Sequence, residues 1–376
     1  MNQTNTPTDG PAGGRGVQFE AAYCVLSDAI AARAFPGCAF GVLAGGTVVL
    51  QDALGRFTYD EDAPATSFET VYDVASLTKV AATTAAAMLL YQRGLLDLDT
   101  PLGDLLPGFV VGRAQGELAR HVKLRHLLAH NSGLAGYVEL FRTAATPSAL
   151  LRACLELPLE AEPGAHAEYS DPGFILLGKA LEVSVREDLA SWLRREVYQP
   201  LGIKVTGFSP ALGARHSIPP TEEDTAFRHR RIQGEVQDEN AWVLKGVAGH
   251  AGLFSNVPDL LAFAGAILAA GRTAGPVADR PSFFDPATVE LFAARQGPLG
   301  SSRALGWDTP SEKSSSGLHF SPHSIGHLGF SGCSLWIDLD AGVAVALLTN
   351  RTWPDRQSQL IREIRPAFHN AVREAL

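Results

Sequence analysis

The sequence has little of what marks membrane proteins and nucleic-acid-binding proteins. Its longest apolar runs, such as AGVAVALLTN near the C-terminus, are far shorter than the roughly 20 residues that a helix needs to cross a bilayer. It contains no run of lysine and arginine, and its net charge of −9 is opposite in sign to that of a surface that neutralises phosphates. We therefore expect neither membrane insertion nor a nucleic-acid partner.

Cysteine is scarce, and its spacing is not that of a metal-binding motif. The four cysteines form neither a CxxC pair nor a spacing typical of zinc ligands. His126 and His130 stand at i and i+4, but no glutamate lies between them and no third ligand is evident. We expect two structural histidines, no metal or other cofactor, and buried free thiols at Cys24, Cys38, Cys154 and Cys333.

The first 16 residues are polar and rich in glycine and proline, without the apolar core of a signal peptide. Such a composition predicts a disordered leader over residues 1–16. We expect a cytoplasmic protein, or a periplasmic or secreted one if a signal has been removed.

Strand-like runs occur near both ends of the chain, with helices between them. We expect a helix over 17–34, a hairpin over 38–55, a helix over 257–271, strands over 303–308, 323–329, 333–340 and 342–350, and a last helix from about 355. This order predicts an antiparallel sheet flanked by terminal helices, with a second, helical lobe. The proposed domains are 17–78 with 241–376 for the sheet and 79–240 for the helices, with the active site in the cleft between them.

Residues 73–80, DVASLTKV, place Ser76 and Lys79 three apart at the expected start of a helix over 76–93. Side chains at i and i+3 lie on one face of a helix, with Cβ atoms roughly 5–6 Å apart. The helix start favours developing negative charge on the serine, and a nearby amine could serve as its base. The S-x-x-K pattern alone is weak, because a serine cap followed by a solvated lysine is common.

Two later segments complete a constellation. EYSDPGF contains Tyr169 before a helix that starts with proline, and GHLGFSG contains His327 and Gly329 in a late strand. In order and rough spacing, SLTK, YSD and HLG resemble the S-x-x-K, Y-x-N and K/H-x-G motifs of the penicillin-recognising serine hydrolases. The resemblance is strongest to the branch with class C β-lactamases, DD-peptidases and esterases, and it extends over nearly the whole chain.

The resemblance implies an α/β (α+β) fold with a five-stranded antiparallel sheet and an all-helical lobe. It also implies that Ser76 attacks a carbonyl to form an acyl-enzyme, while Lys79 and Tyr169 share the proton relay. The oxyanion hole would use the N–H groups of Ser76 and Phe330. Gly329 would let its strand approach the substrate without a Cβ clash.

The sequence departs from the family at two positions. Asp171 replaces the usual asparagine, and it is either a helix cap before Pro172 or a carboxylate in the cleft that would hold Lys79 as the ammonium. Leu328 replaces a residue whose hydroxyl binds the carboxylate of a β-lactam or of a C-terminal D-alanine. Arg351 or Arg356 could supply a compensating cation.

These features predict a serine hydrolase of amide or ester bonds, acting on a peptidoglycan-like peptide or D-amino-acid amide. A β-lactamase and a short-chain carboxylesterase would share the machinery. A silent binding protein with this fold is the alternative of another class, although it would not need the nucleophile and relay. The partner is a small-molecule or peptide substrate, and the sequence does not reveal the oligomeric state.

Overall fold

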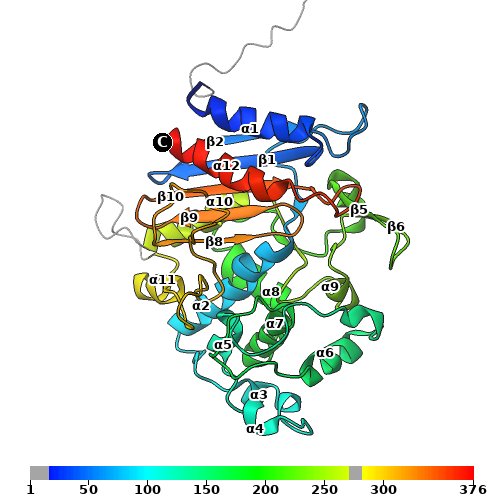
Figure 1. Ribbon diagram of the computed structural model, residues 1–376, viewed down its shortest axis with the longest axis vertical. Coiled ribbons are helices and arrows are strands. Elements are labelled where there is room, and N and C mark those ends of the chain that lie inside the picture. The colour runs from blue at the N-terminus through cyan, green and yellow to red at the C-terminus, as the bar shows by residue number, and fades with distance from the viewer. Residues whose placement is uncertain (1–16, 271–281) are drawn as a thin grey trace, which may run out of the picture.

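The computed structural model describes residues 17–270 and 282–376, so the predicted leader lies outside the described residues. Its centre is a five-stranded sheet in the order β2-β1-β10-β9-β8 (Figure 1). All neighbouring strands are antiparallel. The strands are β1 (Gly37–Ala44), β2 (Thr47–Gly55), β8 (Ser324–Leu328), β9 (Ser334–Asp338) and β10 (Val343–Thr349). The predicted five-stranded antiparallel sheet is confirmed.

Helices cover both faces of this sheet. The first and last helices, α1 (Glu20–Ala31) and α12 (Ile361–Glu374), lie together over one face, and their apolar sides share a core with Phe40, Trp336 and Val345 (Figure 1). The other face packs against α10 (Val257–Ala270), which follows the pattern predicted for it. Burial of both faces explains why β1 and β10 read as almost continuous apolar runs rather than as alternating strands.

A mainly helical region lies below edge strand β8 in Figure 1. Its core is continuous with the core on the α10 side of the sheet. Its helices are α2 (Ala85–Gln92), α3 (Leu102–Leu105), α4 (Gly116–Ala119), α5 (Leu124–Leu128), α6 (Pro147–Glu156), α7 (Asp171–Val185), α8 (Leu189–Leu193) and α9 (Glu239–Val243); α11 (Pro286–Ala293) packs beside α2.

Some predicted elements are wrong. The segment 303–308 is not a strand but a turn closed by the Ala304 N–H on the Trp307 carbonyl, and Gly306 has a φ of 84°. The sequence also gave no sign of two small sheets. One is β3 (Tyr72–Asp73), β7 (Leu253–Ser255) and β4 (Gly207–Phe208), and the other is the hairpin of β5 (Pro220–Asp224) and β6 (Arg230–Gln233).

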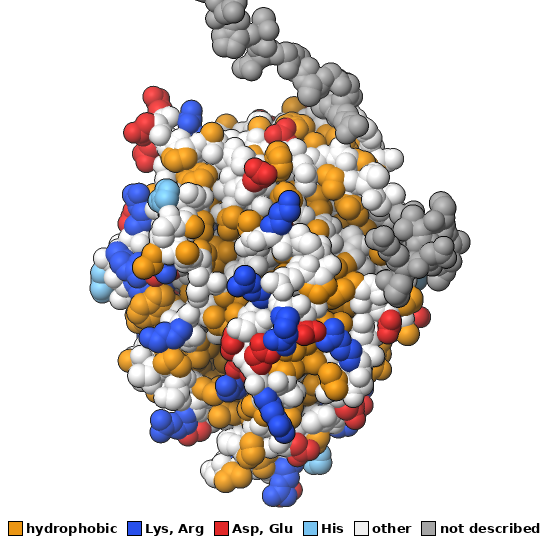
Figure 2. All heavy atoms as spheres, turned by 180° about the vertical axis from the view of Figure 1, so that it is seen from behind, with side chains coloured by type: hydrophobic (Ala, Val, Ile, Leu, Met, Phe, Trp, Pro, Cys, Tyr) orange, Lys and Arg blue, Asp and Glu red, His pale blue; other side chains and the backbone are white. Residues whose placement is uncertain are grey.

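Three of the four cysteines are buried as predicted, but Cys24 is exposed. None of the helices in the described ranges is long and apolar enough to cross a membrane. On the face shown in Figure 2, acidic and basic side chains are interspersed, and neither sign dominates that face.

Candidate active site

Ser76 lies in a tight turn rather than at the start of a regular helix. A 3-10 turn spans Ala75–Leu77, a π-helical segment spans Lys79–Thr84, and only then does α2 begin. Ala75 has a φ of 47°, which is unfavourable for a residue with a side chain. The Asp73 carboxylate accepts the Ala75 N–H at 2.8 Å and so helps to hold this turn. The result is a partly exposed serine on a fixed backbone.

Lys79 is buried and uses all three of its hydrogen-bond donors. Its Nζ donates to Ser76 Oγ at 3.1 Å, to Asp171 Oδ1 at 2.6 Å and to the His250 carbonyl at 3.2 Å. Burial alone would lower the pKa of Lys79, but the Asp171 carboxylate outweighs it, so the net pKa is raised. Lys79 is therefore an ammonium with no lone pair available to accept the Ser76 proton.

Asp171 points at Lys79 and does not cap its helix. The cap of α7 is Ser170, whose Oγ accepts the Gly173 N–H at 3.0 Å and donates to the Ala135 carbonyl. The capping interpretation of Asp171 is thus wrong, because the residue before it already fills that position. Its carboxylate is free to form the ion pair with Lys79, with a side chain only 14% exposed.

Tyr169 completes the group around Ser76. The Lys79 ammonium lies 4.7 Å from the centre of the tyrosine ring. Burial raises the pKa of the Tyr169 phenol, and side-chain contacts with Lys79 and Ser76 only partly oppose this. The phenol is therefore neutral at physiological pH.

Two buried histidines flank the Tyr169 ring. The His130 ring centre lies 4.6 Å from that of Tyr169, and the His327 ring centre lies 5.8 Å away. Burial holds the pKa of both imidazoles well below the ordinary value, so both are neutral. His327 Nδ1 donates to the Leu328 carbonyl, whereas His130 Nδ1 accepts the Ser170 N–H. His327 thus brings no positive charge to the position where lysine is usual.

The end of β8 lies against the Ser76 turn. A Cβ on Gly329 would come within 2.5 Å of the Val74 carbonyl oxygen, so only glycine permits this approach. Among the hydrogen bonds of the described residues, none is donated by the N–H of Ser76 or of Phe330. Both donors are thus unused by the chain, as the predicted oxyanion hole requires.

Arg351 packs against the segment that follows β8 and donates hydrogen bonds to backbone there. Its guanidinium donates to the carbonyls of Phe330, Arg356 and Ser358, and it lies over the Phe330 ring. Arg356 is paired with Glu222 and Glu239. Neither arginine is thus a free cation for a substrate carboxylate, the role that the sequence suggested for one of them.

Leu328 lines a cavity of about 430 Å³ at the edge of β8, together with Lys313, Leu318, Arg362 and Arg365. Position 328 carries no hydroxyl, and weakened recognition of a substrate carboxylate at this position stays a prediction.

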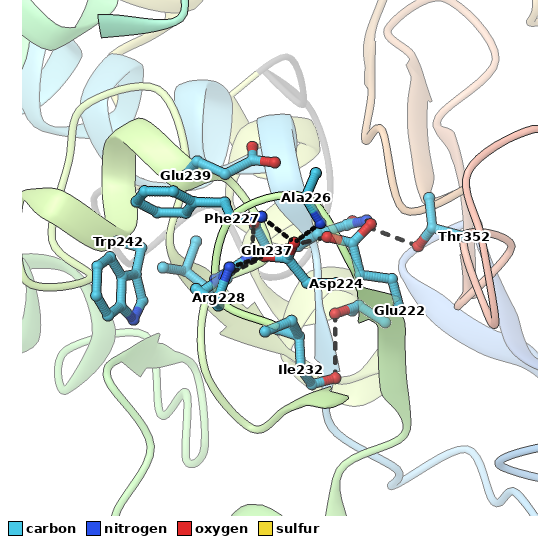
Figure 3. A network of polar contacts seen from close by, with 12 residues as sticks. Glu222, Asp224, Ala226, Phe227, Arg228, Ile232, Gln237, Glu239, Trp242 and Thr352 are labelled. Carbon is cyan, nitrogen blue, oxygen red and sulfur yellow. Dashed lines mark hydrogen bonds and ion pairs between the residues drawn. The ribbon is translucent and has the colours of Figure 1, made fainter. Parts of the chain in front are cut away.

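The β5–β6 hairpin is locked by a buried polar network (Figure 3). Arg228 donates to Asp224 and to the carbonyls of Val236 and Gln237. Gln237 in turn accepts from Thr352, which follows β10, and its own N–H donates to Asp73. This network therefore connects the hairpin to the residue that holds the Ser76 turn.

Other residues singled out in the sequence have structural partners. His126 Nδ1 accepts the Lys123 N–H, which agrees with a structural role. His250 is not among the predicted site residues, but its carbonyl is the third acceptor of Lys79, and its Nε2 contacts Asp238 at 2.9 Å. Only its neighbourhood in the glycine-rich segment VAGHAG hinted at this role. Within residues 17–270 and 282–376, no cluster of three His, Cys, Asp or Glu residues could hold a metal ion.

Comparison with known proteins gives a consistent assignment. The family profile described as "Beta-lactamase" matches residues 25–366. The chain is 30% identical to an N-acetylmuramyl-L-alanine amidase of Bacillus subtilis (strain 168) over 85% of this chain and 78% of the relative. It is also 30% identical to a protein of Salmonella paratyphi B provisionally named as a D-alanyl-D-alanine carboxypeptidase, over 75% of this chain and 69% of that one.

A solved structure has the same fold. EstCE1, a hydrolase with promiscuous acyltransferase activity, superimposes with a TM-score of 0.75 over 94% of this chain and 99% of its own, at 22% identity. The profile match and the two relatives identify the family as well as the fold. This chain belongs to the β-lactamase family of serine hydrolases.

Proposed function

We propose that this protein hydrolyses an amide bond in a peptidoglycan-like peptide or D-amino-acid amide through an acyl-serine intermediate. One observation carries the proposal: the Lys79 ammonium joins Ser76 Oγ and Asp171 within hydrogen-bond distance, beside the ring of Tyr169. A silent binding protein would have no need of a partly exposed serine held against a buried ammonium.

Ser76 attacks the substrate carbonyl, and the oxyanion is stabilised by the N–H groups of Ser76 and Phe330. Loss of one such donor typically costs ~10²–10³ in rate. Lys79 remains an ammonium and stabilises negative charge on Ser76 Oγ, because Asp171 holds its proton in place.

Tyr169 moves the proton. A neutral phenol can accept the Ser76 proton on its oxygen while it releases its own proton to the leaving nitrogen. One proton enters and one leaves, so the phenol needs no low pKa for this step. In deacylation a water molecule replaces Ser76 as the donor, and Ser76 takes the proton back.

The relatives support a cell-wall substrate. One is named as an N-acetylmuramyl-L-alanine amidase and the other provisionally as a D-alanyl-D-alanine carboxypeptidase. Both names describe cleavage of an amide bond next to alanine. The absence of a hydroxyl at Leu328 argues against efficient turnover of ordinary β-lactams.

A carboxylesterase is the second candidate. Phe330, beside the predicted oxyanion hole, is 49% exposed and offers an apolar surface to an acyl or alkyl group. The fold is also that of EstCE1, a hydrolase with acyltransferase activity. An ester needs less help from a proton donor than an amide does, because an alkoxide is the better leaving group.

The test compares turnover of an N-acyl-D-Ala-D-Ala peptide, p-nitrophenyl butyrate and nitrocefin on one preparation, with Ser76→Ala as the blank. We expect peptide turnover that Ser76→Ala abolishes, and slow nitrocefin turnover that Leu328→Thr increases. Turnover of the ester alone would support the second candidate. Rapid nitrocefin hydrolysis by the wild type would contradict the argument from Leu328.

A further inference from the structure

The charged groups around Ser76 are nearly all paired with one another. Lys79 is neutralised by Asp171, and Arg356 by Glu222 and Glu239. Arg351 donates its hydrogen bonds to backbone carbonyls. A substrate anion would therefore gain little from these cations.

Arg303 differs from them. Its guanidinium carbon lies 5.1 Å from the centre of the Tyr169 ring, and its side chain is 25% exposed. Its ion-pair partner is Asp308, with 3.8 Å between Arg303 Nη1 and Asp308 Oδ2, which is beyond hydrogen-bond distance. The other oxygen of Asp308 accepts from Ser302 at 2.6 Å. Among the residues that the structure describes, Arg303 is thus a cation beside Tyr169 with donors to spare.

The backbone around Arg303 is well anchored. The Arg303 carbonyl accepts the Gln296 N–H at 2.8 Å, and Asp308 exchanges two backbone hydrogen bonds with Gly326, the residue before His327. Farther along the same loop, Asn131 donates to the Gly297 carbonyl at 2.7 Å. The segment is therefore fixed between β8 and the residues that follow α5, so the position of Arg303 next to Tyr169 is built into the fold.

Acidic groups occupy another part of the surroundings of Lys79. Burial would raise the pKa of Asp238, but its contact with His250 at 2.9 Å lowers it, and the Lys79 ammonium makes a smaller contribution in the same direction. Burial makes the largest contribution to the raised pKa of Tyr137, and Asp238 and Glu239 add to it. An anionic substrate group would meet carboxylates there that already contact His250 and Arg356, whereas it would meet a cation at Arg303.

We propose that Arg303 binds a carboxylate on the departing part of the substrate. The proposal deepens the proposed function and rests on it. Because Tyr169 protonates the leaving nitrogen, a group held beside the Tyr169 ring belongs to the leaving amino acid. Arg303 would hold this carboxylate through charge-assisted hydrogen bonds, and the substrate would be a peptide with a free C-terminus. Arg303 thereby takes over the recognition that Leu328 cannot provide.

The test uses a matched pair of substrates, N-acyl-D-Ala-D-Ala with a free carboxylate and the same peptide as its C-terminal amide. We expect the wild type to prefer the carboxylate in kcat/KM by at least about tenfold, the lower end of what a hydrogen bond to a charged group is worth. Arg303→Gln should remove that preference, mainly through KM. The amide-capped peptide should change by less than about twofold, and Arg303→Lys should recover part of the loss. Arg152→Gln, on the exposed side of α6, serves as the matched control.

Turnover of p-nitrophenyl butyrate on the same preparations helps to distinguish a failure of the role proposed for Arg303 from a failure of the proposed function. Ester turnover retained in Arg303→Gln shows that the variant is folded and that Ser76 still works. Equal turnover of the two peptides by the wild type, or an equal loss on both in Arg303→Gln, would overturn the role of Arg303. Failure of the proposed function would appear instead as the same peptide turnover in Ser76→Ala as in the wild type, or as ester turnover without peptide turnover, and the role of Arg303 would fall with it.

Discussion

At the scale of single residues, the ion pair between Lys79 and Asp171 decides which side chain can accept the Ser76 proton. Three acceptors take all the hydrogen-bond donors of the Lys79 ammonium. The Asp171 carboxylate keeps the pKa of Lys79 raised although Lys79 is completely buried. Mechanisms in which the lysine is a free base do not fit this arrangement. In the proposed mechanism we therefore assign the movement of the proton to the phenol of Tyr169.

Asp171→Asn tests this division of roles. With its counter-ion gone, burial dominates and the pKa of Lys79 falls, so the amine loses its charge at a lower pH than in the wild type. The basic limb of the kcat/KM profile should therefore move to lower pH by at least about one unit. Profiles recorded side by side for wild type, Asp171→Asn and the exposed control Asp104→Asn check this. Superimposable profiles for all three would show that the carboxylate does not hold the ammonium.

At the scale of elements, the site depends on how closely β8 approaches the Ser76 turn. Gly329 lies against the Val74 carbonyl, and Arg365 fixes the same segment through the carbonyls of Gly329, Gly332 and Cys333. The strand end thus cannot shift away from the turn without losing these bonds.

Gly329→Ala should displace the N–H of Phe330 from the oxyanion position. We expect kcat to fall by about 10²-fold or more, as for the loss of an oxyanion donor. Gly213→Ala is the control, because a Cβ there meets nothing within 4 Å. Circular dichroism should show both variants folded. Wild-type kcat in Gly329→Ala would mean that the strand end does not contribute to the oxyanion hole.

The sequence predicted the long elements well, because α10 and the five strands carry strong apolar patterns. It failed where a contact distant in sequence decides the local structure. The turn at Ser76 depends on Asp73, and the small sheet depends on β7 meeting β3 and β4. The segment 303–308 alternates like a strand, but Gly306 breaks it and Asp308 pairs with Gly326. That error concealed Arg303, which only the fold brings next to Tyr169.

At the scale of the whole molecule, burial of neutral histidines makes stability depend on pH. The pKa values of His130 and His327 are held well below the ordinary value by burial, and that of His369 is lowered to about 4. Between about pH 6.5 and pH 4 the unfolded chain therefore binds more protons than the folded protein at these sites, so stability falls as pH is lowered. Asp73 changes stability with pH in the opposite direction, because burial raises its pKa to about 6 and the folded protein then binds the extra proton. Three histidines outweigh this one carboxyl.

We expect the free energy of unfolding, measured with urea, to decrease steadily from pH 7 to pH 5. His369 lies far from the Ser76 turn in sequence and contacts Ser315 and Ser334, so it can be tested without touching the proposed site. His369→Gln should lower the slope by up to about 1.4 kcal/mol per pH unit, the value for one proton. An unchanged slope in this variant would rule out His369 as a source of the pH dependence.

The location of the protein in the cytoplasm stays a prediction, and so do the individual roles of Tyr169, His327 and Phe330. The family assignment does not depend on them, since it rests on the profile match over residues 25–366. What all the proposals share is a nucleophilic Ser76.

Intact-mass spectrometry with a fluorophosphonate probe tests that claim most directly. The wild type and a surface control, Ser191→Ala, should each gain one probe mass, and peptide mapping should place it on Ser76. Ser76→Ala should gain none. A stoichiometric adduct that persists in Ser76→Ala, or no adduct on a wild type that turns over substrate, would contradict the account.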